Sequence, residues 1–179
     1  YNLSKVPGNK LIVSTLEANR LIADVWFARA DFAKDHGPFL EALVRGILDG
    51  TEELYDDQAK KQEAAKLMAE GYNLPAADAL SMLGDAHWTN YAENFEFFLN
   101  QNNPTNFERT WDTAYYLYGR VGRAGPKVPW DQVADFSILK RLASDPKYSK
   151  HQNRYQTQFA AKSVSMIQAE SGEILTKTV

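Results

Sequence analysis

The stretch LIVSTLEANRLIADVWFARADF, which spans residues 11–32, contains two apolar runs separated by a polar turn. Both runs are rich in β-branched and aromatic residues, which are typical of strands. The sequence therefore predicts one short β-hairpin, in which residues 11–14 pair with residues 24–28. The rest of the chain shows helical periodicity. We thus expect a mainly α fold with a short β-hairpin, an α+β arrangement, with the hairpin packed on helices that begin near Pro38 and Pro104.

The composition favours a folded protein. The chain has 179 residues, of which 44% are hydrophobic and 12% are aromatic, so it can bury a core as one domain or as a domain followed by a tail. Its net charge of −3 is spread over interspersed acidic and basic residues, so we expect no nucleic-acid partner. No apolar run approaches the roughly 20 residues needed to cross a bilayer. The absence of cysteine excludes disulfides and sulfur-bound metals, and it is compatible with export.

Three helices are expected in the first half of the chain. An amphipathic helix is predicted from Pro38 to about Tyr55, because apolar residues recur there at steps of three and four. A second helix follows, and Gly71 is expected to end it in the left-handed conformation. Pro75 begins a third, short helix that we expect to end near Gly84.

The clearest helical pattern begins near Pro104, where Thr105 and Glu108 have the spacing of a capping box. We expect Gly122 to end this helix. Its apolar face is predicted to consist of Phe107, Trp111, Ala114, Tyr115, Tyr118 and Val121.

The expected domain organisation follows from a change of composition. Residues 1–145 carry the predicted hairpin and helices, the last of which is centred on Phe136, Leu139 and Leu142. Residues 146–179 contain few large apolar residues and no sustained period until an alternation near the end, so we expect a linker or tail there.

Motifs for catalysis and for metal binding are not recognisable in the sequence. The three histidines, His36, His87 and His151, lie far apart, and none has a partner at the spacing of a helical zinc site. A glycine-rich phosphate loop and a Gly-x-Ser-x-Gly elbow are both absent from the sequence. We therefore expect no enzymatic activity, no cofactor and no metal.

The segment LGDAHWTNYAENFEFF has polar residues within an otherwise apolar run, which makes it the best candidate for ligand contact. In one interpretation its aromatic side chains cover the core, while Asn90 or Asn94 caps the next helix. In the other, His87 and Trp88 face a cleft that holds a small polar ligand. The sequence leaves both interpretations open.

Three segments resemble the C-terminal half of periplasmic solute-binding proteins of the nitrate, sulfonate and taurine type. They are residues 11–50, 71–98 and 107–122, and the likeness, which rests on their order and spacing, covers roughly residues 10–142. Such proteins are the extracytoplasmic receptors of ABC importers, and their two lobes close on a solute. The resemblance implies a periplasmic location, an ABC permease as partner and a small solute. Candidate solutes are anions such as nitrate, phosphate or a sulfonate, and a neutral pyrimidine.

The resemblance also implies where a solute would bind. The predicted hairpin corresponds to the crossing between the lobes, so its turn would face the ligand. The implied ligand-binding residues are Thr15, Glu17, Asn19 and Arg20, with His87 and Trp88 as neighbours. The sheet-forming N-terminal segment of the family has no counterpart here, so we expect a fragment of a type II periplasmic-binding-protein fold. Its expected partner is the missing N-terminal segment or a second copy of the chain.

The tail has a resemblance of its own, and two other functional classes stay open. Residues 159–179 resemble the linker that enters an OmpA-like domain, which implies contact with peptidoglycan through a fused domain. One alternative class is a non-enzymatic helical interaction module without a ligand. The other is an enzyme of the thiamine-pyrimidine type, which shares the fold of these receptors, but His87 does not lie in a matching motif.

Overall fold

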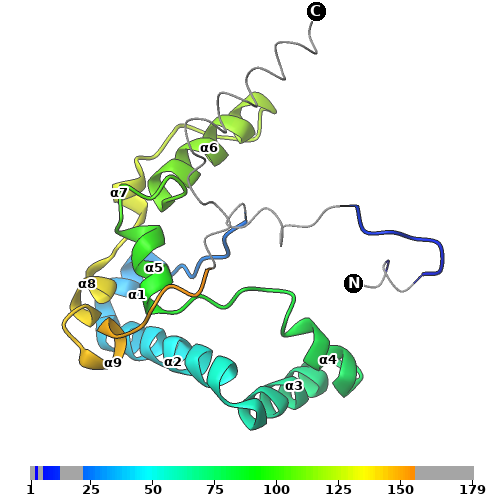
Figure 1. Cartoon of the computed structure of the whole chain (residues 1–179). Coiled ribbons are helices and arrows are strands. Elements are labelled where there is room, and N and C mark those ends of the chain that lie inside the picture. The colour runs from blue at the N-terminus through cyan, green and yellow to red at the C-terminus, as the bar shows by residue number, and fades with distance from the viewer. Residues whose placement is uncertain (1–2, 4–5, 13–21, 156–179) are drawn as a thin grey trace, which may run out of the picture.

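The computed structural model describes residues 3, 6–12 and 22–155. Within these residues the chain forms nine helices and no strand (Figure 1). The helices are α1 (Ala30–Asp35), α2 (Gly37–Asp56), α3 (Gln58–Tyr72), α4 (Ala76–Met82), α5 (Tyr91–Phe98), α6 (Phe107–Arg120), α7 (Trp130–Val133), α8 (Ser137–Leu142) and α9 (Pro146–Ser149).

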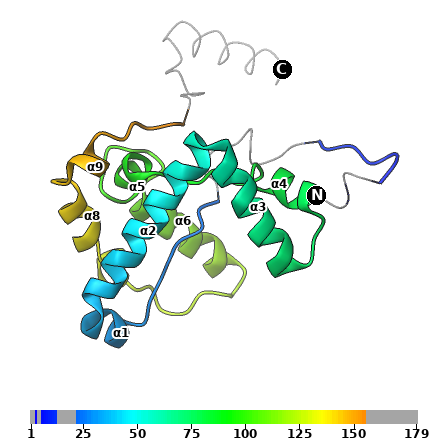
Figure 2. The same ribbon diagram turned by 90° about the horizontal axis from the view of Figure 1, so that it is seen from below.

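The longest helix, α2, organises the molecule. The α3–α4 pair follows its C-terminal end, and α5, α8 and α9 lie along it (Figures 1 and 2). Helix α6 contacts α5 and extends away from α2. Pro38 occupies the first turn of α2, where its missing N–H costs nothing. The helix predicted from Pro38 to Tyr55 is therefore confirmed.

The main core lies where α2, α5, α8 and α9 meet. Its buried residues are Leu48, Tyr91, Leu142 and Tyr148, one from each helix. The hydroxyl groups of both tyrosines are satisfied, since Tyr91 donates to the carbonyl of Leu139 and Tyr148 donates to Asp49. Desolvation raises the pKa of both phenols. The packing of these side chains joins Leu48 to Leu142 and Tyr148, which lie about a hundred positions later in the sequence.

A second, smaller core joins α3 to α4. It is formed by Ala65, Ala69, Ala79 and Leu83, and the small alanine side chains let the two helices approach closely. The expected short helix after Pro75 is confirmed as α4. The predicted stop at Gly71 is wrong, because α3 continues to Tyr72 and Asn73 takes the left-handed conformation with φ 52°. Asparagine is the residue that most often replaces glycine in this role.

Helix α6 is confirmed, but its cap differs from the predicted capping box. The side chain of Asn106 accepts a hydrogen bond from the backbone N–H of Arg109 at 2.9 Å. Thr105 lies before the cap, and its hydroxyl donates to the side chain of Asn103. As predicted, Gly122 follows the helix, with φ 67°.

The predicted β-hairpin is wrong. Residues 24–28 and the described residues of the other run, Leu11 and Ile12, form no strand; residues 13–21 lie outside the described part. Within the described part, no backbone hydrogen bond joins residues 22–28 to another segment. β-Branched and aromatic side chains favour extended backbone, but a strand also needs a hydrogen-bonded neighbour. The α+β assignment, and with it the fragment of a two-lobed α/β fold, is therefore replaced by a helical architecture.

The expected linker begins with ordered structure. Residues 146–149 form α9, whose N-cap Asp145 accepts a hydrogen bond from the backbone N–H of Lys147 at 3.0 Å. Tyr148 is almost completely buried in the main core. Residues 150–155 continue beside α2 and α5, and residues 156–179 lie outside the described part.

Ion pairs along one side of α2 align the C-terminal segment. The pairs, at 2.6–2.9 Å, are Glu41–Arg141, Arg45–Asp145, Asp49–Lys147 and Glu52–Arg154. The partners on α2 recur at steps of three and four, so they share one face of the helix. Arg45, assisted by the N–H of Lys147, lowers the pKa of Asp145. Partly exposed pairs contribute little stability individually, so their main effect is to fix which turn of α2 each partner meets.

Candidate functional site

Two of the predicted ligand-binding residues, His87 and Trp88, lie in the loop between α4 and α5. The Nε2 atom of His87 is 3.0 Å from Oε2 of Glu93, and its ring stacks on Tyr155 at 4.0 Å between centroids. Its Nδ1 atom is 3.5 Å from the hydroxyl of Tyr55. Trp88 is partly exposed, and its indole N–H donates to the carbonyl of Leu83. His87 is thus held by contacts with Glu93, Tyr55 and Tyr155, and both His87 and Trp88 remain accessible to solvent.

Glu93 connects the start of α5 to the C-terminal segment. Its fully buried carboxylate accepts hydrogen bonds from the backbone N–H groups of Asn90 at 2.9 Å and Arg154 at 2.7 Å. The side chain of Asn90 accepts from the N–H of Glu93 and donates to the carbonyl of Gln152. This reciprocal arrangement is a capping box. The interpretation in which Asn90 caps the next helix is confirmed.

Arg154 occupies the gap between Glu93 and α2. Its guanidinium bonds Glu52 at 2.6 Å and lies 4.2 Å from the centre of the Tyr55 ring. Desolvation, followed by the charge of Glu93, raises the pKa of Tyr55. We call the contact between α2, the start of α5 and residues 151–155 the junction. Three of its buried atoms, on Glu52, His151 and Arg154, lack hydrogen-bond partners among the described residues. The bonds of Arg154 join these three parts of the chain, and contact of His87 with a ligand stays a prediction.

The other predicted ligand-binding residues, Thr15, Glu17, Asn19 and Arg20, lie outside the described residues. Their approach to His87 and Trp88 therefore stays a prediction.

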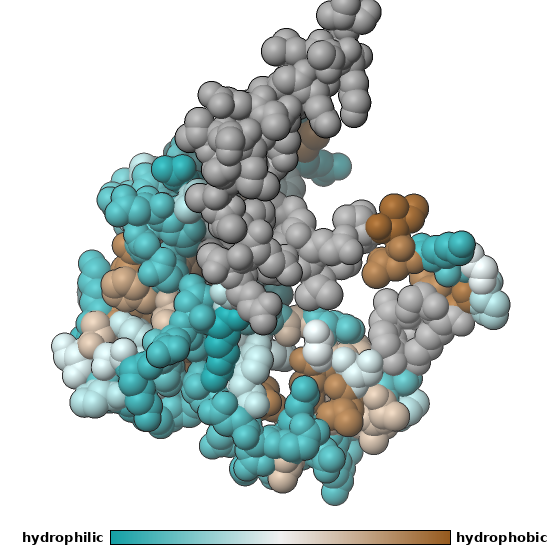
Figure 3. All heavy atoms as spheres, in the orientation of Figure 1, coloured by the Kyte–Doolittle hydropathy of each residue, from teal (hydrophilic) through white to brown (hydrophobic). Residues whose placement is uncertain are grey.

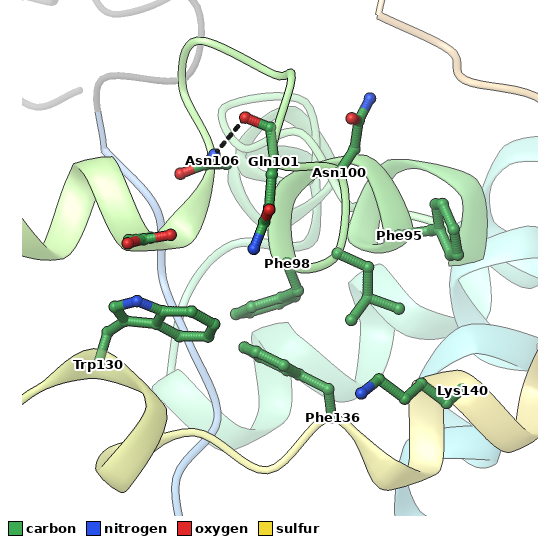
Figure 4. A pocket seen from close by; sticks show the side chains of 10 residues that line it. Phe95, Phe98, Asn100, Gln101, Asn106, Trp130, Phe136 and Lys140 are labelled. Carbon is green, nitrogen blue, oxygen red and sulfur yellow. Dashed lines mark hydrogen bonds between the residues drawn. The ribbon is translucent and has the colours of Figure 1, made fainter.

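A pocket of about 320 Å³ offers a different candidate site (Figure 4). It lies between the end of α5, the start of α6 and the α7–α8 region. Three rings form its apolar part: Phe136 is 5.5 Å from Phe98 and 5.8 Å from Trp130 between centroids, and its ring stacks on that of Trp130. The lining residues are Phe95, Phe98, Leu99, Asn100, Gln101, Asn106, Glu108, Trp130, Phe136 and Lys140. Aromatic walls with a few polar groups are typical of small-molecule sites.

Two asparagines fix the loop that borders this pocket. Asn106 donates to the carbonyl of Gln101 at 3.1 Å, drawn as the dashed line in Figure 4. Asn100 donates to Glu96 at 2.7 Å. In contrast, the side chains of Gln101, Glu108 and Lys140 make no hydrogen bond or ion pair with any residue that the structure describes. The pocket thus combines a fixed rim with polar groups that remain available for a ligand.

The sequence did not identify this pocket. Phe98, Trp130 and Phe136 are brought together by tertiary packing, and no sequence spacing links α5 to α7 and α8. The only available signal was the density of aromatic residues in these segments, which equally indicates a core.

Comparison with protein-family models, with characterised proteins and with solved structures finds no match. Among the described residues, no group of three or more histidine, aspartate or glutamate side chains could hold a metal ion. In the same residues, no helix is both long enough and apolar enough to span a membrane.

Proposed function

We propose that this chain is a non-enzymatic solute-binding component of an ABC importer, located in the periplasm, which delivers a small solute to a permease. The observation that carries solute binding is the aromatic pocket with three polar side chains, those of Gln101, Glu108 and Lys140, that make no hydrogen bond or ion pair within the described part of the chain. The importer role rests on the resemblance of residues 11–50, 71–98 and 107–122 to such receptors. Lys140 supports a solute with an anionic group, because an ammonium group can donate to it.

The solute should bind only weakly to the pocket of a single chain. The lining residues Gln101 and Lys140 are exposed, so a bound solute keeps much of its surface in water, and roughly millimolar affinity is expected. A companion polypeptide, or a second copy that covers the opening, would bury the solute further.

An NMR titration tests the pocket directly. Taurine, nitrate and phosphate are added to 15N-labelled protein, and at least one should shift the amide signals of Gln101, Glu108 and Lys140. Phe136→Ala should abolish these shifts because it removes the ring between Phe98 and Trp130. The exposed Phe39→Ala is the matched control and should bind like the parent protein. Unchanged pocket signals with all three solutes would refute binding of these anionic solutes there.

A second candidate function is a helical interaction module. It is favoured by the segment before α1, where Ile22, Trp26 and Phe27 expose large apolar side chains, Trp26 by 79% and Phe27 by 93%. Large exposed apolar side chains also occur at Leu11 and Ile12, in the described residues 6–12 (Figure 3). Apolar surface of this kind tends to be covered by a partner.

We expect the exposed apolar side chains before α1 to cause self-association. Sedimentation velocity over a range of concentrations should show a monomer that converts to a dimer or larger species. The double variant Trp26→Ser with Phe27→Ser should shift this conversion to concentrations at least about tenfold higher, because two large apolar side chains leave the contact. Leu67→Ser, on the exposed side of α3, is the control and should behave like the parent. A monomer at every concentration would contradict self-association through this segment.

A further inference from the structure

We infer that the aromatic pocket selects a zwitterion of amino-acid size with an aromatic body, rather than a simple anion. This inference rests on the proposed solute-binding function and names the ligand class for the same pocket. It is carried by two opposite charges, Glu108 and Lys140, that line one cavity without forming an ion pair with each other.

The positions of the two charges come from different elements. Glu108 lies in the first turn of α6, and Lys140 lies in the last turn of α8. Each residue type suits its own helix end, since carboxylates are favoured at N-termini and ammonium groups at C-termini. Lys140 also has an electrostatic interaction with Asp135. Helix-end preference does not account for both side chains lining the same pocket without a hydrogen bond or ion pair to any described residue.

Charge balance then restricts the ligand. A simple anion can pair with Lys140 but leaves Glu108 without a partner on the ligand, and a simple cation can pair with Glu108 but leaves Lys140 without one. Either ion therefore satisfies only one of the two charges, so both should bind more weakly than a molecule that carries both charges. A zwitterion satisfies the two groups together, with its anionic end at Lys140 and its ammonium at Glu108.

The aromatic rings specify the body of the ligand. Phe98, Trp130 and Phe136 lie against one another at the centre of the pocket, with Lys140 beside Phe136 (Figure 4). Rings in offset or edge contact attract a further ring, and their faces also attract an ammonium group. The side chain of Gln101 reaches toward these rings, and its amide can both donate and accept. A volume of about 320 Å³ is at the lower end of ligand pockets, which suits a molecule of amino-acid size.

Three probes with the same phenyl body separate these contributions: phenylalanine, 3-phenylpropanoate and 2-phenylethylamine. In NMR titrations phenylalanine should bind most tightly and shift the amide signals of Gln101, Glu108 and Lys140. Lys140→Gln should weaken phenylalanine and 3-phenylpropanoate by about tenfold and leave 2-phenylethylamine unweakened. Glu108→Gln should weaken phenylalanine and 2-phenylethylamine by about tenfold, and it should leave 3-phenylpropanoate equal or tighter.

Lys66→Gln and Glu70→Gln make the same charge changes on exposed positions of α3, and neither should alter binding. If Lys140→Gln weakens phenylalanine but Glu108→Gln does not, or if 3-phenylpropanoate binds at least as tightly as phenylalanine, zwitterion selection is wrong while solute binding stands. If none of the probes shifts the pocket signals, and nitrate, phosphate and taurine also fail to do so, both proposals fall. Binding of phenylalanine that neither variant changes would likewise overturn the ligand class.

Discussion

Replacing Glu93 by alanine is expected to lower the free energy of unfolding by about 3–5 kcal/mol, as for the loss of one partner from a buried ionic network. The carboxylate is 0% exposed and bonds two backbone N–H groups, those of Asn90 and Arg154, and it contacts the imidazole of His87. Without it these donors stay buried with no acceptor, and each such group costs about 1–3 kcal/mol. The capping box of α5 is lost in the same step.

Urea denaturation followed by circular dichroism measures this loss. Glu93→Gln retains one side-chain oxygen and the shape of the residue, so it should cost less than Glu93→Ala. Glu70→Ala, at an exposed position of α3, is the matched control and should change stability by less than about 0.5 kcal/mol. A cost for Glu93→Ala below about 1 kcal/mol would mean that water satisfies the donors and that the junction is not a closed structural unit.

The sequence predicted helices well where the signal is local. Pro38, Pro75 and Gly122 all mark helix ends in the structure, because proline and glycine restrict or free the backbone at their own position. The caps of α3 and α6 were missed by one or two residues, since several asparagine, glycine and threonine residues near each end compete for the same role. Local chemistry specifies that a helix ends, but the packing of its neighbours decides at which residue.

The wrong hairpin prediction and the ordered start of the expected tail have a common physical origin. The hairpin was inferred from side chains in residues 24–28, but a strand depends on a hydrogen-bonded neighbour that the local sequence does not reveal. The segment after Pro146 looked like a linker because its apolar residues are few, yet Tyr148 is enough to anchor it in the core. Its hydroxyl bonds Asp49, and its ring faces Arg45 at 5.4 Å. Both outcomes depend on contacts with distant residues.

The candidate sites likewise depend on contacts between residues that are distant in the sequence. His87 was selected because a polar residue in an apolar run suggests ligand contact, which stays a prediction. Its Nε2 atom lies 3.0 Å from Glu93, whose buried position the sequence did not indicate. The aromatic pocket needs residues from α5, α6, α7 and α8, and its unpaired charges become visible only when these helices are assembled. A sequence can therefore suggest chemical groups, while the availability of those groups to a ligand depends on the fold.

Truncation of Leu142 is the second change that we expect to lower the free energy of unfolding strongly, because this residue fills the main core between α2, α5 and α9. Its side chain is 0% exposed and packs with Leu48, Tyr91 and Tyr148. Leu142→Ala removes buried methyl groups and leaves a cavity, so we expect the free energy of unfolding to fall by about 2–5 kcal/mol.

Leu67→Ala is the same chemical change at a site that is 64% exposed, on α3, and it should change stability by less than about 0.5 kcal/mol. Urea unfolding of both variants, followed by the same helical signal, measures the difference directly. A gap of several kcal/mol between the two would show that residues 137–149 are part of one cooperative core with α2. Equal effects would mean that α8 and α9 open independently of it, and the boundary expected at residue 145 would then move toward the start of α8, before Leu142.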